Sequence, residues 1–245
     1  HDERAAAFIA LGWAEQSQTP VAICCTSGSA CLNYYPAIAE AYYRNIPILA
    51  LTADRPAKWI NQGDGQTIVQ REVFKNHTHS YLGFDEDSFV LNTSNKNALQ
   101  QFLAYFNRSW KGPIHLNIGL NEPLYGLAAF KQFSFEPQTN KVEPTILPDF
   151  SVLSGKKIMV LVGQMEPDHP FERLLSEFAS WSNVVVLVEN TSNLQNELFN
   201  HCIDRSLNSI DPNDSALQPE VLLSFGGAIV SKRIKAYLRQ ISLNI

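Results

Sequence analysis

The sequence has few cysteines, no long apolar run and no excess of basic residues, and each absence excludes a class of protein. Four cysteines in 245 residues, with Cys24 and Cys25 adjacent, provide neither a disulfide framework nor the paired thiols of a structural zinc site. No uninterrupted apolar run approaches the roughly 20 residues that a membrane-spanning helix needs. The 19 Lys and Arg are scattered and outnumbered by 24 Asp and Glu, which argues against a nucleic-acid footprint and a polybasic membrane anchor. We therefore expect a cytoplasmic protein with free thiols.

The sequence begins with neither an initiating Met nor the pattern of a signal peptide. Residue 1 is His1 rather than Met, and Asp2, Glu3 and Arg4 follow without the basic and apolar regions of a signal peptide. We expect a piece of a longer chain. Its length suffices for one large domain or two small ones with buried cores.

Short apolar runs alternate with segments of helical periodicity, which is typical of α/β architecture. Several runs are apolar on consecutive positions, as in parallel strands covered by helices on both faces. The expected strands cover residues 21–25, 46–51, 114–118, 157–163, 184–188 and 221–227, and the expected helices cover residues 30–43, 97–110, 170–181 and a stretch from 231 onward. The sequence predicts two open, mainly parallel sheets.

Periodicity disappears in a polar, proline-punctuated stretch that is typical of an interdomain linker. We predict a first domain over residues 1–130, a linker over residues 131–155 and a second, Rossmann-like domain over residues 156–245, with both domains incomplete.

Two expected strands end in small and glycine-rich sequences, Thr26-Ser27-Gly28 and Gly226-Gly227. Open parallel sheets bind ligands at the carboxyl ends of their strands, where the next helix offers its first N–H groups. Neither sequence is a full dinucleotide fingerprint, and each alone is typical of a tight β-to-α turn. They gain meaning only together with other motifs.

Those other motifs are present in a specific order. They are Asp2-Glu3-Arg4-Ala5-Ala6-Ala7, Cys25-Thr26-Ser27-Gly28, Ala41-Tyr42-Tyr43, Ile46-Pro47 and Leu51-Thr52-Ala53-Asp54-Arg55-Pro56. Together they resemble the pyrimidine-binding domain of thiamine-diphosphate enzymes. The further motifs are Gly65-Gln66-Thr67-Ile68, Asn121-Glu122-Pro123-Leu124-Tyr125-Gly126 and Gly226-Gly227 through Ser231-Lys232-Arg233. With them most of the chain resembles one family of menaquinone biosynthesis, the 2-succinyl-5-enolpyruvyl-6-hydroxy-3-cyclohexene-1-carboxylate synthases.

The resemblance implies thiamine diphosphate as cofactor, with Glu3 as the catalytic acid and Glu3, Thr26, Ser27 and Gly28 as cofactor-binding residues. A glutamate at the position of Glu3 hydrogen-bonds the aminopyrimidine ring in this superfamily and promotes its imino tautomer, while the cofactor supplies the carbanion. Taken alone, Glu3 would read as a solvated acid in the first turn of a helix.

The resemblance also implies that 2-oxoglutarate is decarboxylated and its succinyl unit added to isochorismate. These substrates carry several carboxylates, for which Arg offers a bidentate fork and Lys a point charge. We expect Arg55, Gln66, Lys232 and Arg233 to contact substrate, although a Lys-Arg pair at a helix start is ordinarily a solvated face and Gln66 could be an exposed loop amide. Family members usually carry Asn where this chain has Gly65 before Gln66.

A second motif of the superfamily has only a partial counterpart. Gly63-Asp64-Gly65 followed by Asn92 is similar to its metal and diphosphate motif, but the preceding residues 59–62 do not form the buried strand that this motif requires. We assign no metal ligand in this chain and expect the ligands of Mg²⁺ and diphosphate outside it. His77 and His79 have no third ligand nearby and receive no role.

Three interpretations remain at this point. The first is a fragment of such a synthase, inactive by itself and a homodimer or homotetramer in its full-length form. The second is another thiamine-diphosphate enzyme, such as an acetolactate synthase or a 2-oxoacid decarboxylase. The third is a noncatalytic α/β nucleotide-binding module, against which the lack of a phosphate-loop lysine counts.

Overall fold

The structure is a computed structural model that describes residues 2–86, 93–103, 111–121 and 149–241. The chain divides into two compact units, His1–Val142 and Glu143–Ile245. Both are α/β, as predicted from the alternation of apolar runs and helical periodicity.

The first unit is built on a parallel four-stranded sheet with the order β1-β2-β4-β3. Its strands are β1 (Val21–Cys25), β2 (Ile48–Asp54), β3 (Tyr81–Asp85) and β4 (Ile114–Gly119). The register pairs Cys25 with Thr52, and Gly119 with both Asp54 and Asp85. All four carboxyl ends therefore meet at one edge of the sheet.

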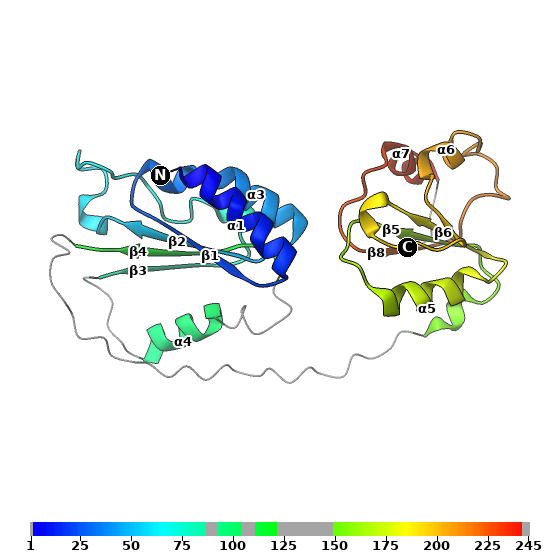
Figure 1. Cartoon of the computed structure of the whole chain (residues 1–245), viewed down its shortest axis with the longest axis horizontal. Coiled ribbons are helices and arrows are strands. Elements are labelled where there is room, and N and C mark those ends of the chain that lie inside the picture. The colour runs from blue at the N-terminus through cyan, green and yellow to red at the C-terminus, as the bar shows by residue number, and fades with distance from the viewer. Residues whose placement is uncertain (1, 87–92, 104–110, 122–148, 242–245) are drawn as a thin grey trace. The chain divides into compact units, whose positions relative to one another are not determined.

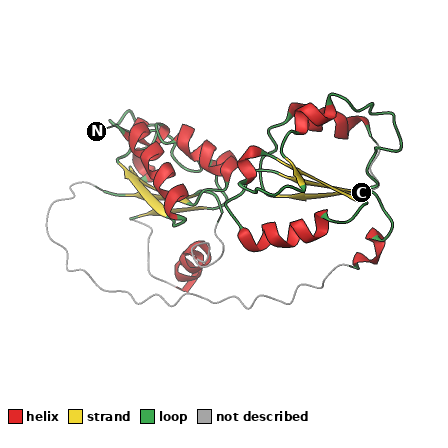
Figure 2. Ribbon diagram, turned by 45° about the vertical axis from the view of Figure 1, so that its right-hand side comes forward, coloured by secondary structure: helices red, strands yellow, loops and turns green. Residues whose placement is uncertain are grey.

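Helices cover both faces of this sheet (Figures 1 and 2). The helices α1 (Glu3–Ser17), α2 (Ser29–Leu32) and α3 (Tyr35–Arg44) lie on one face, and α4 (Thr93–Leu103) lies on the other. Because side chains alternate along a strand, Ile48 and Ala50 of β2 enter the core under α1 and α3, whereas Leu49 packs toward the opposite core with Phe102 of α4. The 3₁₀ helices η1 (Ala57–Trp59) and η2 (Lys75–His77) follow β2.

The helix predicted over residues 30–43 is divided in two. The chain leaves the first helix after Leu32, and Pro36 occupies the first turn of α3. Proline fits a first helical turn, where its missing N–H is not needed, and is unfavourable inside a helix. The predicted helix over residues 97–110 starts earlier, at Thr93, and residues 104–110 lie outside the described part of the chain.

The second unit is a parallel sheet with the order β7-β6-β5-β8. Its elements are η4 (Phe150–Leu153), β5 (Ile158–Val162), α5 (His169–Ala179), β6 (Val184–Val188), η5 (Asn190–Ser192), β7 (Phe199–Asn200), α6 (Ile203–Leu207), β8 (Val221–Phe225) and α7 (Lys232–Gln240). Figure 1 shows α5 on one face, with α6 and α7 on the other. Along β5, Ile158 and Val160 pack toward α5, while Met159 and Leu161 pack toward α6 and α7.

The predicted linker, residues 131–155, lies mostly outside the described residues. In its described part, Leu153 packs against the core of the second unit. The predicted division at residues 130 and 156 stays a prediction. Within the described ranges, we find no helix that combines the length and apolar character needed to cross a bilayer.

Candidate cofactor and substrate site

Glu3 begins α1 and lies near the carboxyl end of β1. The N-cap of α1 is Asp2, whose carboxylate accepts a hydrogen bond from the Ala5 N–H at 2.9 Å and so fixes where the helix starts. Burial is the main cause that raises the pKa of the Cys25 thiol to about 12, and the negative charge of Glu3 adds to this shift. Burial is also the main cause that raises the pKa of Tyr34, followed by the Cys25 and Cys24 thiols, and Glu3 adds the smallest contribution. Ala7, one turn after Glu3 on α1, belongs to the same buried core as Cys25, the last residue of β1, and Glu3 itself is half-buried.

The turn after β1 requires glycine at position 28. Gly28 has φ 86° and ψ −146°, a conformation that is nearly restricted to glycine. A Cβ atom at this position would lie 3.1 Å from the backbone oxygen of Gln66. The Gly28 N–H is donated to Oε1 of Gln70 at 2.7 Å. Gly28 therefore supplies close backbone packing to the site, whereas Thr26, two residues earlier, is exposed to solvent and Ser27 is buried.

Gln70 belongs to a buried polar cluster behind this turn. Its Nε2 donates to the backbone oxygen of Ala53 at 2.9 Å and to Oδ1 of Asn117 at 3.1 Å. Asn117 in turn donates from Nδ2 to Oδ2 of Asp54 at 2.8 Å, and its Oδ1 also accepts from the Thr52 hydroxyl at 2.6 Å. These bonds connect the end of β1, the end of β2 and the middle of β4.

His115 completes the cluster as a neutral base. Its Nε2 lies 2.8 Å from Oγ1 of Thr52, and because that hydroxyl donates its proton to Asn117, the histidine Nε2 must be the donor. This leaves a bare lone pair on Nδ1, which has no hydrogen-bond partner in the described part of the chain. Burial lowers the pKa of His115 to about 4. His115 therefore carries no charge at neutral pH.

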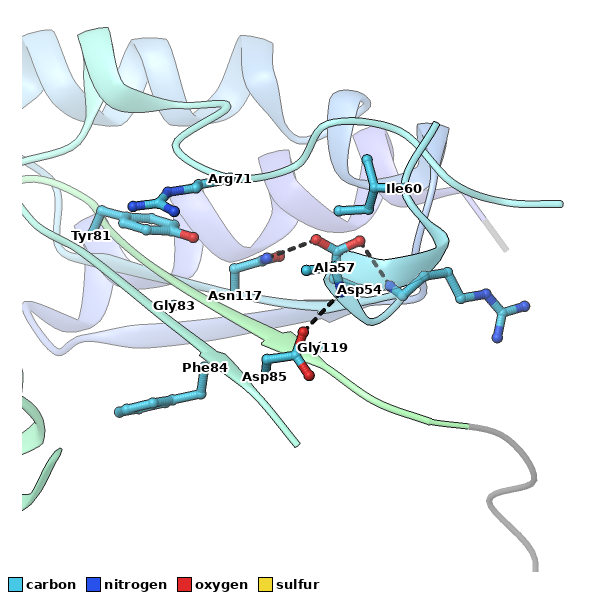
Figure 3. A pocket seen from close by; sticks show the side chains of 11 residues that line it. Asp54, Ala57, Ile60, Arg71, Tyr81, Gly83, Phe84, Asp85, Asn117 and Gly119 are labelled. Carbon is cyan, nitrogen blue, oxygen red and sulfur yellow. Dashed lines mark hydrogen bonds between the residues drawn. The ribbon is translucent and has the colours of Figure 1, made fainter. Parts of the chain in front are cut away.

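A cleft of about 300 Å³ opens at the carboxyl ends of β2, β3 and β4 (Figure 3). Asp54, Asp85 and Arg71 are among its lining residues, and Figure 3 shows the guanidinium of Arg71 beside the ring of Tyr81. Burial raises the pKa of Asp54, and hydrogen bonds from Asn117 and from the Arg55 N–H partly oppose this shift. The cleft thus combines carboxylate, guanidinium, amide and phenol groups, which suits a polar ligand.

The predicted substrate residues Arg55 and Gln66 flank this part of the first unit. Arg55 follows Asp54 directly and lines the cleft, with its backbone N–H 2.8 Å from Oδ1 of Asp54. Gln66 is exposed, adopts φ 57°, and packs its backbone on Gly28. The structure thus brings the predicted cofactor turn and the loop of Gln66 into contact.

Lys232 and Arg233 lie in the first turn of α7 in the second unit. The Ser231 side chain caps the helix by accepting from the Ile234 N–H at 3.1 Å, and Glu189 accepts from the Ser231 N–H at 2.7 Å. Arg233 donates to Oδ1 of Asn208. Two cations in a first helical turn oppose the helix dipole, which favours negative charge there. Such a local conflict is typical of residues kept for function.

The motifs set aside from the sequence have structural surroundings of their own. His77 accepts or donates a 2.9 Å hydrogen bond with the Tyr35 hydroxyl and packs edge-on against Tyr42, while the ring of His79 stacks on Tyr42. The backbone oxygen of Asp64 accepts from the Thr67 hydroxyl at 2.5 Å. Asn92 and residues 122–126 lie outside the described residues.

Sequence reasoning missed the buried polar cluster, namely Thr52, Asp54, Gln70, His115 and Asn117. The available signal was the presence of polar residues inside otherwise apolar strands, at His115 and Asn117. No local pattern marks Gln70, because it lies in a polar loop and its burial depends on distant residues.

Comparison with protein families places the first part of the chain. Residues 1–78 match the family model described as thiamine pyrophosphate enzyme, N-terminal TPP binding domain. This range includes the Glu3 helix start, the Gly28 turn and the loop of Gln66 and Gln70.

Comparison with curated proteins extends over almost the whole chain. A 2-succinyl-5-enolpyruvyl-6-hydroxy-3-cyclohexene-1-carboxylate synthase of Flavobacterium johnsoniae is 43% identical over 98% of this chain and 44% of its own length. Proteins with the same name from Christiangramia forsetii and Porphyromonas gingivalis are 40% and 36% identical, again over 98% of this chain, and are covered over 46% and 43% of their lengths. The chain therefore spans less than half the length of these relatives.

Proposed function

Because the chain belongs, by similarity over 98% of its length, to the 2-succinyl-5-enolpyruvyl-6-hydroxy-3-cyclohexene-1-carboxylate synthases, a family of thiamine-diphosphate enzymes, we propose that it serves their reaction. In that reaction 2-oxoglutarate loses CO₂, and the remaining four-carbon unit is added to isochorismate as a carbanion equivalent. The observation that carries the proposal is the half-buried Glu3 carboxylate at the start of α1, beside the end of β1 and its glycine turn.

The residues at this edge fit the pyrimidine part of the cofactor. Thiamine diphosphate supplies the electron sink when it is bound. Glu3 would hold a proton at a ring nitrogen of the pyrimidine, since its carboxylate is only partly desolvated and lies at the carboxyl end of β1. Thr26 offers an exposed hydroxyl in the same turn, and Gly28 keeps the turn tight against the loop of Gln66. We propose Mg²⁺ and the diphosphate to be held by residues outside this chain.

The substrate carboxylates would be bound by Arg55, Lys232 and Arg233, with Gln66 as a neutral hydrogen-bonding neighbour. Arg55 supports this role through its place on the wall of the cleft, and Lys232 and Arg233 support it through their unfavourable position at a helix N-terminus. A charge-assisted hydrogen bond to each carboxylate would offset that unfavourable position.

We also propose that the complete enzyme is a cytoplasmic homodimer or homotetramer. Free cysteines at positions 24, 25, 31 and 202 support a reducing compartment. Ile9 and Trp13 support assembly, because these large apolar side chains lie one turn apart on α1 and are 70% and 67% exposed. Sedimentation of the complete enzyme tests the assembly directly.

The test of the function is the Glu3→Gln variant of the complete enzyme. We expect the fold to be kept and turnover to fall by orders of magnitude, because the amide cannot hold the proton that the carboxylate shares with the cofactor. Hydrogen–deuterium exchange at the thiazolium carbon should slow in parallel.

The matched control is Asp2→Asn, which removes the neighbouring carboxylate and keeps an oxygen that can cap α1. This variant should keep wild-type exchange and turnover. Equal exchange rates in wild-type enzyme and the Glu3→Gln variant would contradict the role of Glu3.

A further inference from the structure

The Gln70 side chain makes three hydrogen bonds within the described residues, to the turn after β1, to the end region of β2 and to the middle of β4. Its Oε1 accepts from the Gly28 N–H after β1, and its Nε2 donates to the Ala53 oxygen near the end of β2 and to Oδ1 of Asn117 in β4. The distances are 2.7, 2.9 and 3.1 Å, respectively. The side chain is completely buried. Both amide hydrogens and one oxygen lone pair are therefore used, as the burial of an amide requires.

The segment from Gln66 to Gln70 holds the Gly28 turn at two points. At one end, the backbone of Gln66 occupies the space that a Cβ of Gly28 would need. At the other end, Gln70 accepts the Gly28 N–H. The same Gln70 side chain also reaches Ala53, which precedes Asp54 and Arg55. One amide thus connects the turn proposed for the cofactor with the two segments of the first unit that are proposed for the substrate, those of Arg55 and Gln66.

We propose that Gln70 is a positioning residue that fixes the Thr26–Gly28 turn relative to Arg55 and the loop of Gln66. This inference rests on the proposed function for the identity of the two ligands, but the linkage of the three segments does not depend on it. We expect Gln70 to contact neither ligand, since its side chain is completely buried and both amide hydrogens bond to protein groups. Its loss should therefore disturb binding of cofactor and substrate together and leave the proton chemistry of Glu3 in place.

Two substitutions distinguish the hydrogen bond to Gly28 from the hydrogen bonds to Ala53 and Asn117. Gln70→Met keeps the length and packing of the side chain and removes all three hydrogen bonds. Gln70→Glu keeps an oxygen that can accept from Gly28 but cannot serve both Ala53 and Asn117, because an ionised carboxylate has no donor and a protonated one has a single O–H. The matched control is Gln101→Met, which makes the same chemical change at an exposed position of α4.

The first measurement needs no cofactor and uses the chain as it is. Amide hydrogen exchange at Gly28 should accelerate about tenfold or more in Gln70→Met, because a buried hydrogen bond is lost, and should stay near wild type in Gln70→Glu and Gln101→Met. Unchanged Gly28 exchange in a folded Gln70→Met variant would overturn the linkage to the cofactor turn.

The second measurement uses the complete enzyme. Gln70→Met should raise both the apparent Kd for thiamine diphosphate and the KM of an acid substrate about tenfold, with thiazolium exchange near wild type at saturating cofactor. Gln70→Glu should raise the substrate KM while the cofactor Kd changes little. A fall in kcat with unchanged Kd and KM in Gln70→Met would overturn the proposal. An unchanged substrate KM in Gln70→Glu would overturn it as well. If Gln70→Met does not fold, the substrate KM of Gln70→Glu decides.

Failure of the proposed function would look different from failure of this inference. If the wild-type complete enzyme neither binds thiamine diphosphate nor turns over 2-oxoglutarate, the proposed function is wrong, whereas Gly28 exchange still tests the linkage. If the wild-type enzyme is active and the Gln70 variants match it in Gly28 exchange, Kd and KM, the positioning role alone is wrong.

Discussion

Asn117 donates a hydrogen bond to Asp54 across two neighbouring parallel strands, over 2.8 Å from Nδ2 to Oδ2. Because an ionised carboxylate can only accept, this contact fixes the orientation of the Asn117 amide. Its oxygen then points at Thr52 and Gln70, and the Thr52 hydroxyl is left to accept from His115. One carboxylate thereby sets the orientation of the Asn117 amide and, through it, the direction of the hydrogen bonds of Thr52 and His115.

The Gly28 turn leads to a prediction about backbone conformation. Gly28→Ala should lower the free energy of unfolding by about 1–3 kcal/mol, because the conformation is unfavourable for any residue with a Cβ and the new atom meets the Gln66 backbone. Gly12→Ala in α1 is the control, since none of the described residues has an atom within 4 Å of its Cβ position outside its own helix, and it should raise the free energy of unfolding by about 0.5–1 kcal/mol. Urea denaturation followed by circular dichroism measures both. Equal stability of Gly28→Ala and wild type would refute the argument.

The buried His115 predicts a loss of stability in mild acid. Its pKa is about 4 in the folded protein and about 6.5 when unfolded, so the unfolded state binds more protons between these values. Stability should therefore fall as the pH drops from about 6.5 to 4, by on the order of 3 kcal/mol from this group. The raised pKa of Asp54 acts in the opposite direction.

Comparison of variants isolates the histidine from other groups. Unfolding free energies at pH 7 and pH 4.5 should differ less in His115→Gln than in wild type. His79→Gln, at an exposed position of the same unit, should keep the wild-type pH dependence. The explanation fails if His115→Gln loses as much stability between the two pH values as wild type does.

The first turn of α7 predicts opposite effects of two adjacent substitutions. Ser231→Ala removes the N-cap and should cost about 1 kcal/mol or more. Lys232→Ala should leave stability unchanged or raise it by up to about 0.5 kcal/mol, because it removes a cation from the positive end of the helix dipole. Thermal denaturation measures the stability of the two variants. An equal loss of stability in both would mean that Lys232 has a structural role.

The carboxylate assignment predicts a selective kinetic effect in the complete enzyme. Changing Arg55, Lys232 or Arg233 to Ala should raise the KM of one acid substrate ten- to over a hundredfold, as expected when a charge-assisted hydrogen bond worth about 1.5–3 kcal/mol is lost. Varying 2-oxoglutarate and isochorismate separately identifies which acid each residue binds. Arg239→Ala, at the exposed end of α7, is the control and should change neither KM. Wild-type kinetics in all three variants would exclude the assignment.

The apolar strands were predictable because they are continuous β-branched runs. The strand at Val184–Val188 was predicted to the residue, and β5 and β8 differ from their predicted ranges only at the ends. The edge strand β3 was missed, because Tyr81–Asp85 is interrupted by the exposed Gly83 and its other residues are only half-buried, so it contains no continuous apolar run. Periodicity identifies strands that are buried on both faces and says little about others.

The candidate site could be proposed from the sequence only where its residues belong to local motifs. Glu3 at a helix start and Gly28 after a strand are recognisable from their neighbours along the chain. Gln70 is not, because its three partners come from positions 28, 53 and 117 and its surroundings in sequence are polar. The contact between Gln66 and Gly28 is likewise a property of the tertiary fold.

The packing of Gln66 on Gly28 and the hydrogen bond from Gly28 to Gln70 limit how this protein can be re-engineered. A loop transplanted from another enzyme to alter substrate preference would replace residues 61–70 and remove the acceptor of the Gly28 N–H at the same time. Such a chimaera would lose cofactor affinity even if its new loop matched the new substrate. The smallest exchangeable module is therefore discontinuous, and it comprises this loop together with Gly28, Ala53 and Asn117.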